Sequence, residues 1–176
     1  MDPVAESEID QTRLRRFLGY RLTRTEILVH KLFLQRCEAL SLKPGEYSIL
    51  VMVDANPGIY LRQLGEALDI SPSNLVPVLD RLVQRDLMQR RADTRDRRLQ
   101  QLHLTATGQA VLSQAEQKVE ELECNFDQIL SPAERVHLIS ALDKLSDFMA
   151  KELAAQLPQR REETTMPPTI KTKARA

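Results

Sequence analysis

The sequence has 176 residues, a length that suits one well-packed domain better than several. Lysine and arginine number 25, as do aspartate and glutamate, so the formal net charge is zero. This balance excludes a histone-like polycation and an acidic solvating tail, but it leaves room for a local basic patch that binds nucleic acid. Five glycines, no tryptophan and 4% aromatic residues favour a mainly α-helical protein over a β-sandwich.

Several classes of protein and site are not expected. Cys37 and Cys124 lie far apart and outside any metal-ligand spacing, so neither a disulfide scaffold nor a metal site is predicted, and both are expected to pack in apolar surroundings. No phosphate-binding glycine loop or hydrolase motif is present, which argues against an enzyme and against a cofactor. The acidic start and the lack of a long apolar run predict a cytoplasmic protein.

The first part of the chain predicts three helices. Apolar residues recur at helical spacing from Thr12 to Leu40, which indicates one long amphipathic helix. Pro44 can begin a second helix that runs through Val53, and an Asn-Pro-Gly turn at 56–58 ends it. A short helix with an apolar face follows over 61–68.

The middle part predicts a capped helix and then two strands. Ser71 can cap a helix that has Pro72 at its first position. Its buried stripe comprises Leu75, Val78, Leu79, Leu82 and Val83. Apolar residues then alternate over 87–90 and 99–104, which predicts a β-hairpin whose charged loop spans 91–98.

The last part predicts two further helices and a tail. A long helix is expected over 109–130, and Ser131-Pro132-Ala133-Glu134 has the pattern of a capping box that begins another. The apolar residues of that last helix form a heptad-like seam: Leu138, Leu142, Leu145, Met149 and Leu153. Residues 158–176 have almost nothing to bury, which predicts a disordered basic tail.

This order of elements predicts a winged helix-turn-helix, mainly α-helical with a small β-hairpin. In such a fold the second helix of the motif enters the major groove of DNA, and the hairpin can place an arginine in the minor groove. The charge distribution agrees with DNA binding by this part of the chain, because residues 80–98 contain seven arginines and only four aspartates. Between Glu116 and Glu134, in contrast, six acids accompany one lysine.

Four motifs in this order and spacing resemble the MarR (multiple antibiotic resistance regulator) family of transcription factors. The most specific is the wing, where Arg90-Arg91-Ala92-Asp93-Thr94-Arg95-Asp96-Arg97-Arg98 precedes Leu104-Thr105-Ala106-Thr107-Gly108. The supporting motifs are Leu42-Lys43-Pro44, Asn56-Pro57-Gly58-Ile59 and Asp80-Arg81-Leu82. The resemblance covers about Thr12 to Leu157.

The resemblance implies a homodimer that binds a pseudo-palindromic DNA operator and is released by a small effector, often aromatic. Its implied organisation is a flexible N-terminus (1–11), an N-terminal dimerisation helix (12–43), a DNA-binding region (44–104), C-terminal dimerisation helices (105–157) and the tail (158–176). The expected function is a ligand-responsive transcriptional regulator, most simply a repressor. The alternatives are an activator or constitutive DNA binder, and a helical dimer that binds a protein partner through its acidic helix.

The candidate DNA-binding residues come from the recognition helix and the wing: Ser71, Ser73, Asn74, Pro77, Arg81, Arg95, Arg97 and Arg98. Ser71 and Ser73 have the alternative role of capping the helix. Pro77 either kinks the helix or indicates a later start, because an interior proline removes a backbone hydrogen bond. Arg95 is the candidate for the minor groove, and Arg97 or Arg98 is expected to pair with Asp93. Candidate effector-binding residues are Tyr20, Arg24, His30 and Tyr47.

Overall fold

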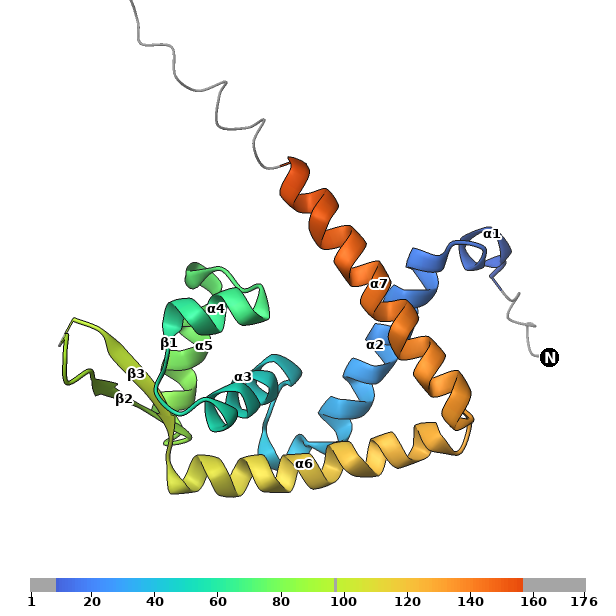
Figure 1. Cartoon of the computed structure of the whole chain (residues 1–176). Helices are drawn as coiled ribbons and strands as arrows, with labels where there is room; N and C mark the ends of the chain where they lie inside the picture. Colours follow the sequence, from blue (N-terminus) through green and yellow to red (C-terminus); the bar gives the residue numbers. More distant parts are fainter. Residues whose placement is uncertain (1–8, 97, 157–176) are drawn as a thin grey trace, which may run out of the picture. The chain divides into compact units, whose positions relative to one another are not determined.

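The computed structural model describes residues 9–96 and 98–156. The chain divides into two compact units, with the boundary between Leu122 and Glu123. The elements in chain order (Figure 1) are α1 (Thr12–Arg15), α2 (Leu18–Arg36), the 3₁₀ turn η1 (Glu38–Leu40), α3 (Pro44–Ala55), β1 (Ile59–Tyr60), α4 (Leu61–Leu68), α5 (Pro72–Gln84), β2 (Met88–Ala92), β3 (Gln100–Leu104), α6 (Ala106–Asp127) and α7 (Pro132–Gln156). No helix in the described ranges is long and apolar enough to cross a membrane. The expected basic tail, Arg97 and residues 1–8 of the expected flexible N-terminus lie outside these ranges.

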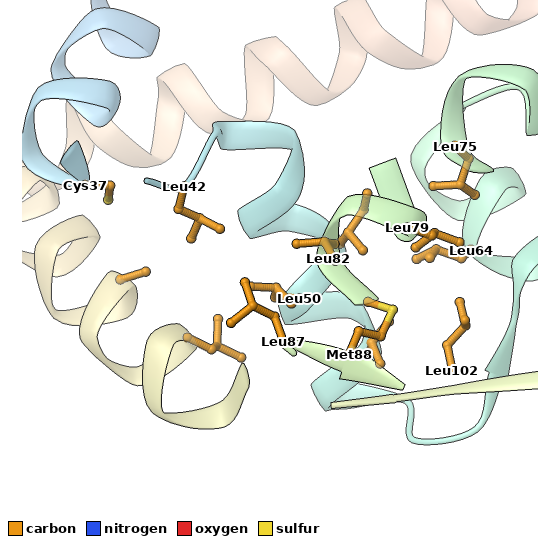
Figure 2. Packing of buried hydrophobic residues seen from close by; sticks show 14 of the residues in the cluster. Cys37, Leu42, Leu50, Leu64, Leu75, Leu79, Leu82, Leu87, Met88 and Leu102 are labelled. Atoms are coloured by element: carbon orange, nitrogen blue, oxygen red, sulfur yellow. The ribbon is translucent and has the colours of Figure 1, made fainter. Parts of the chain in front are cut away.

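The core of the first unit lies between α3, α4, α5 and the sheet. Figure 2 shows Leu50 of α3, Leu64 of α4 and the α5 side chains Leu75, Leu79 and Leu82 directed into one cluster, and all five are fully buried. The sheet adds Met88 and Leu102 to the same cluster. The predicted buried stripe of α5 is confirmed for Leu75, Leu79 and Leu82, and Val78 is half-buried. Val83, near the end of the helix, is 36% exposed, so its predicted burial is wrong.

The helix starts that proline and capping residues predict are confirmed. Pro44 and Pro72 each occupy the first turn of their helix. The Lys43 backbone N–H donates to Glu46 Oε2 at 3.1 Å, which satisfies one of the free donors at the start of α3. Helix α6 begins three residues earlier than expected, at Ala106, because the Thr105 hydroxyl accepts the Gly108 N–H at 2.9 Å as a cap.

The prediction of one uninterrupted helix over 12–40 is wrong. The chain leaves helical geometry at Phe17, whose backbone is extended, and it tightens into the 3₁₀ turn after Cys37. The short α1 is tied back to α2, because the Tyr20 hydroxyl donates to Gln11 Oε1 at 2.8 Å and Arg21 Nε donates to the Arg15 carbonyl at 2.6 Å. Neither contact involves a helix-breaking residue, so apolar spacing could not reveal the interruption.

The hairpin belongs to a sheet of three strands, one more than the sequence predicts. The strand order is β1-β3-β2 and both pairings are antiparallel. Strand β1 has only two residues, with Ile59 opposite Leu102 and Tyr60 opposite Gln101. So short a strand shows no alternation, but it joins the start of α4 to the wing.

The second unit contains the end of α6 and all of α7. The predicted capping box is confirmed, since the Ser131 N–H donates to Glu134 Oε2 at 2.9 Å and the Glu134 N–H reaches Ser131 Oγ at 3.4 Å. Arg135 joins the two helices through Glu123 at 2.6 Å and Asp127 at 2.7 Å. Four members of the predicted heptad-like seam are exposed on α7: Leu138, Leu142, Met149 and Leu153.

Candidate DNA-binding surface and ligand pocket

Helix α5 has a solvent-exposed face at its N-terminal end. Ser73, Asn74 and Pro77 are exposed, while Leu75 and Leu79 on the opposite face are fully buried. This division follows from the apolar spacing, which fixes one side of the helix to the core. The exposed side carries hydroxyl and amide groups that can bond to base edges or phosphates.

The structure tests the capping role proposed for Ser71 and Ser73 and the later helix start proposed for Pro77. Ser71 stands at the cap position but makes no side-chain cap bond; its hydroxyl lies 3.0 Å from the Ser73 hydroxyl instead. The capping role for these two hydroxyls is therefore wrong. Pro77 lies inside a continuous helix that begins at Pro72, so a later start is also wrong. Because proline has no N–H, the Ser73 carbonyl lacks its usual helical partner.

The wing tip is organised by one buried carboxylate. Asp93 is 7% exposed and accepts the Tyr60 hydroxyl at 2.6 Å and Gln101 Nε2 at 2.7 Å. Its other oxygen accepts the backbone N–H groups of Arg95 at 2.6 Å and Asp96 at 3.0 Å. The Tyr60 bond, followed by the two backbone bonds, holds the pKa of Asp93 well below its usual range.

Of the two expected partners of Asp93, Arg98 does not pair with it. The four bonds that described residues donate to the carboxylate come from uncharged groups, and the Arg98 side chain is exposed. Arg97, the other expected partner, lies outside the described residues. Within the described ranges Arg95 forms no ion pair, so its charge is available to a ligand. Among the described residues, hydrogen bonds to neutral groups fix the wing tip, and Arg91, Arg95 and Arg98 are exposed.

A hydrogen-bonded chain connects the wing tip to the base of the sheet. Gln101 donates to Asp93 and has its Oε1 atom 3.3 Å from His103 Nε2. Burial, followed by the charge of Arg91, lowers the pKa of His103. The sequence did not reveal the contact of Tyr60 with Asp93. The two residues are 33 positions apart and come together through the pairing of β1 with β3.

Ion pairs attach the wing and α5 to their neighbours. Arg90 of β2 contacts Asp80 of α5 at 2.6 Å, which fixes the wing relative to the recognition helix. On the other side of α5, Glu46 of α3 lies 3.6 Å from Arg81 Nε and 3.4 Å from Arg85 Nη1. Glu46 is almost fully buried. Its place in the first turn after Pro44, where an acidic residue is favourable, was the only feature of the sequence that could have indicated its role.

A pocket of about 400 Å³ lies beside these ion pairs, between α2, α3 and α5. Its apolar walls are Leu34, Ile49, Ile70 and Val78. The polar lining residues are His30, Lys43, Glu46 and Arg81. A mainly apolar pocket lined by a few polar and charged groups is the usual form of a small-molecule site.

The four candidate effector-binding residues are not brought together. His30 lines the pocket, where its Nδ1 atom also lies 3.7 Å from Glu26 Oε1. Tyr20 bonds to Gln11 and Arg24 is exposed, and neither lines this pocket. Tyr47 packs against Phe33 with ring centroids 5.5 Å apart and does not line it either. The apolar walls and Glu46, which the sequence did not single out, define the pocket instead.

The cysteines differ in environment. Cys37 is buried in the core as expected, and burial raises the pKa of its thiol. Cys124 is exposed, so the expectation that it packs in the core is wrong. Over residues 9–96 and 98–156, no group of three or more His, Cys, Asp or Glu side chains is placed to hold a metal ion.

Comparisons with known proteins agree on one family. The model of the MarR family matches residues 42–99. A protein described as a transcriptional regulator for the hcr operon of Thauera aromatica is 33% identical over 129 residues, which cover 73% of this chain and 78% of that protein.

Solved structures show the same similarity. The transcriptional repressor CouR bound to a 23-mer DNA duplex is 33% identical, with a TM-score of 0.75 over 80% of this chain and 99% of that one. CouR bound to p-coumaroyl-CoA is 31% identical, with a TM-score of 0.72 over 79% of this chain and 98% of that one. MarR of E. coli, at 23% identity and a TM-score of 0.62 over 73% of this chain and 96% of that one, shares the fold.

Proposed function

The chain belongs to the MarR family of transcriptional regulators, and we propose that it is a repressor that an aromatic acid or its coenzyme A thioester releases from a pseudo-palindromic operator. The observation that carries this proposal is the combination of an exposed polar face on α5 with a wing in which Arg95 and Arg98 are exposed near the buried Asp93. In this proposal Ser71, Ser73, Asn74 and Pro77 face the major groove. Arg81 binds a phosphate, and Arg95 enters the minor groove with Arg97 and Arg98 beside it.

A homodimer is part of the proposal. Helix α7 leaves Leu138, Leu142 and Met149 exposed at heptad-like spacing, and α2 leaves Leu28 and Leu32 exposed in the same way. Exposed apolar residues repeated along a helix favour association with another helix. We assign dimerisation to residues 12–43 and 105–157 and DNA binding to residues 44–104. Because the operator lies in the cytoplasm, we place the protein there as well.

The class of effector is inferred from the pocket. Its apolar lining residues suit an aromatic ring, and its polar lining residues can bond to an acidic or hydroxyl substituent. CouR, 31% identical, has been solved with p-coumaroyl-CoA bound, which supports an aromatic acid or acyl-coenzyme A as the effector. Release follows if the effector binds preferentially to a dimer whose recognition helices no longer match the operator.

A gel-shift titration on the DNA immediately upstream of the gene tests this function. We expect a shift at protein concentrations well below those needed for random DNA, and its release by one member of a panel of aromatic acids and their coenzyme A thioesters. A hundredfold loss of affinity requires the effector to favour the released state by only about 2.7 kcal/mol. A shift that no panel member changes would contradict the assigned effector class.

A further inference from the structure

Val76 is an apolar residue on the otherwise polar exposed face of α5. Its side chain is 36% exposed, whereas Leu75 and Leu79 of the same helix are fully buried. It follows Ser73 by three residues, which makes the two side chains neighbours on the helix surface. A valine in a helix keeps one rotamer almost exclusively, so its two methyl groups have a fixed direction. The face proposed to meet DNA therefore carries a rigid apolar group beside its hydroxyl groups.

A hollow of about 300 Å³ lies between α5 and the wing, and Val76 forms part of its lining. Leu61, Leu99 and Leu102 supply the other apolar lining, and Leu99 of the wing is itself 46% exposed. Val76 is thus not a singly exposed apolar residue of the ordinary kind. It belongs to an apolar surface that joins the two elements proposed to bind DNA.

The charges around the hollow suit a DNA strand. Asp80, one turn after Val76, is paired with Arg90, whose Nη2 atom donates to Asp80 Oδ1 at 2.6 Å. Arg98 also lines the hollow, and it forms no ion pair within residues 9–96 and 98–156. The carboxylate nearest to Val76 in the helix is therefore compensated, and a positive charge is left for a phosphate.

The position of the hollow places Val76 at one edge of the major groove. If α5 lies in the major groove and the wing lies in the adjacent minor groove, the strand that separates the two grooves passes between them. The hollow lies between the same two elements. Val76 then faces the base edges next to this strand, and Arg98 faces its phosphates.

Building on the proposed function, we propose that Val76 determines part of the operator sequence by packing against the 5-methyl group of a thymine. Thymine presents a methyl group in the major groove, whereas the other bases are distinguished there by hydrogen-bond donors and acceptors. Ser73 and Asn74 can recognise those donors and acceptors, so Val76 adds information that they do not supply. Burying one methyl group changes affinity about fourfold in each half-site.

Single thymine-to-uracil replacements in the operator test the proposal, because uracil lacks the 5-methyl group and pairs in the same way. The probe is the shortest piece of the upstream DNA that the full-length protein binds specifically, and fluorescence anisotropy measures the affinity. For the wild type we expect one thymine in each half-site at which uracil lowers affinity about fourfold. In Val76→Ala the unmodified operator should bind more weakly by a similar factor, and uracil at that thymine should cause no further loss.

Val83→Ala is the matched control. Val83 is also 36% exposed on α5, but it lies seven residues further along, about 10 Å from Val76 and away from the end that enters the groove. This variant should show the same loss on uracil replacement as the wild type.

Two results would overturn the inference while leaving the proposed function intact. One is a wild type that binds every uracil-containing operator as tightly as the unmodified one. The other is a Val76→Ala protein that loses as much affinity as the wild type at every uracil position. The absence of any specific operator complex with the wild type would instead refute the proposed function, and the inference with it.

Discussion

The Gly108→Ala protein is expected to be strongly destabilised. A methyl group on Gly108 would overlap the Leu87 carbonyl oxygen and lie 2.8 Å from the Leu87 carbonyl carbon. Both are backbone atoms at the start of the wing, and the Thr105 N–H already donates to the same carbonyl at 3.3 Å. Neither α6 nor the wing can move without losing buried contacts, so we expect a loss of about 3 kcal/mol or more. Urea denaturation followed by circular dichroism measures it.

Gly45→Ala is the control for that experiment. Gly45 also lies in the first turn of a helix, but a methyl group there meets no atom within 4 Å. Alanine is the better helix former, so the free energy of unfolding should stay the same or rise by up to about 1 kcal/mol. A Gly108→Ala protein as stable as Gly45→Ala would contradict the close packing of α6 on the wing.

Replacing Asp93 by alanine is expected to weaken operator binding while the helices stay folded. The carboxylate accepts four hydrogen bonds from described residues. Two join the wing tip to Tyr60 of β1 and Gln101 of β3, and two hold the backbone at Arg95 and Asp96. Without it Tyr60 and Gln101 lose a partner, and the backbone around Arg95 loses its fixed geometry. We expect affinity to fall about tenfold or more, measured by fluorescence anisotropy with labelled operator.

Tyr60→Phe separates this effect from a general loss of charge. It removes one of the four bonds and leaves the charges of the wing unchanged. Its effect on affinity should be smaller than that of Asp93→Ala, and the double variant should bind no more weakly than Asp93→Ala alone. Operator affinity in Asp93→Ala equal to that of the wild type would show that the wing needs no such support.

The sequence predicted the parts of the fold that depend on local rules. Apolar spacing located α3, α4 and α5, and proline at the first turn gave the starts of α3, α5 and α7. The Ser131–Glu134 capping box was recognisable for the same reason, because its partners are three residues apart. Such signals are short-range, so one sequence is sufficient to detect them.

What the sequence could not predict depends on contacts between distant residues. Strand β1 has two residues and exists because β3 pairs with it, and Asp93 meets Tyr60 across 33 positions. Because several arginines lie close to Asp93 in the sequence, an ion pair was a simpler prediction than hydrogen bonds from neutral groups. The pocket was missed because its apolar walls look like ordinary core residues, and only the fold leaves a cavity between them.

The most direct test of the central claim, that the exposed face of α5 and the wing bind operator DNA, is an anisotropy titration at several salt concentrations. It compares the wild type with Arg95→Ala and with Lys118→Ala, which removes one positive charge from α6 outside the proposed surface. We predict tight, strongly salt-dependent binding of the wild type, a weaker complex for Arg95→Ala with a slope smaller by about one, and no change for Lys118→Ala. Equal binding of operator and random DNA, or equal affinity and slope in Arg95→Ala and the wild type, would contradict it.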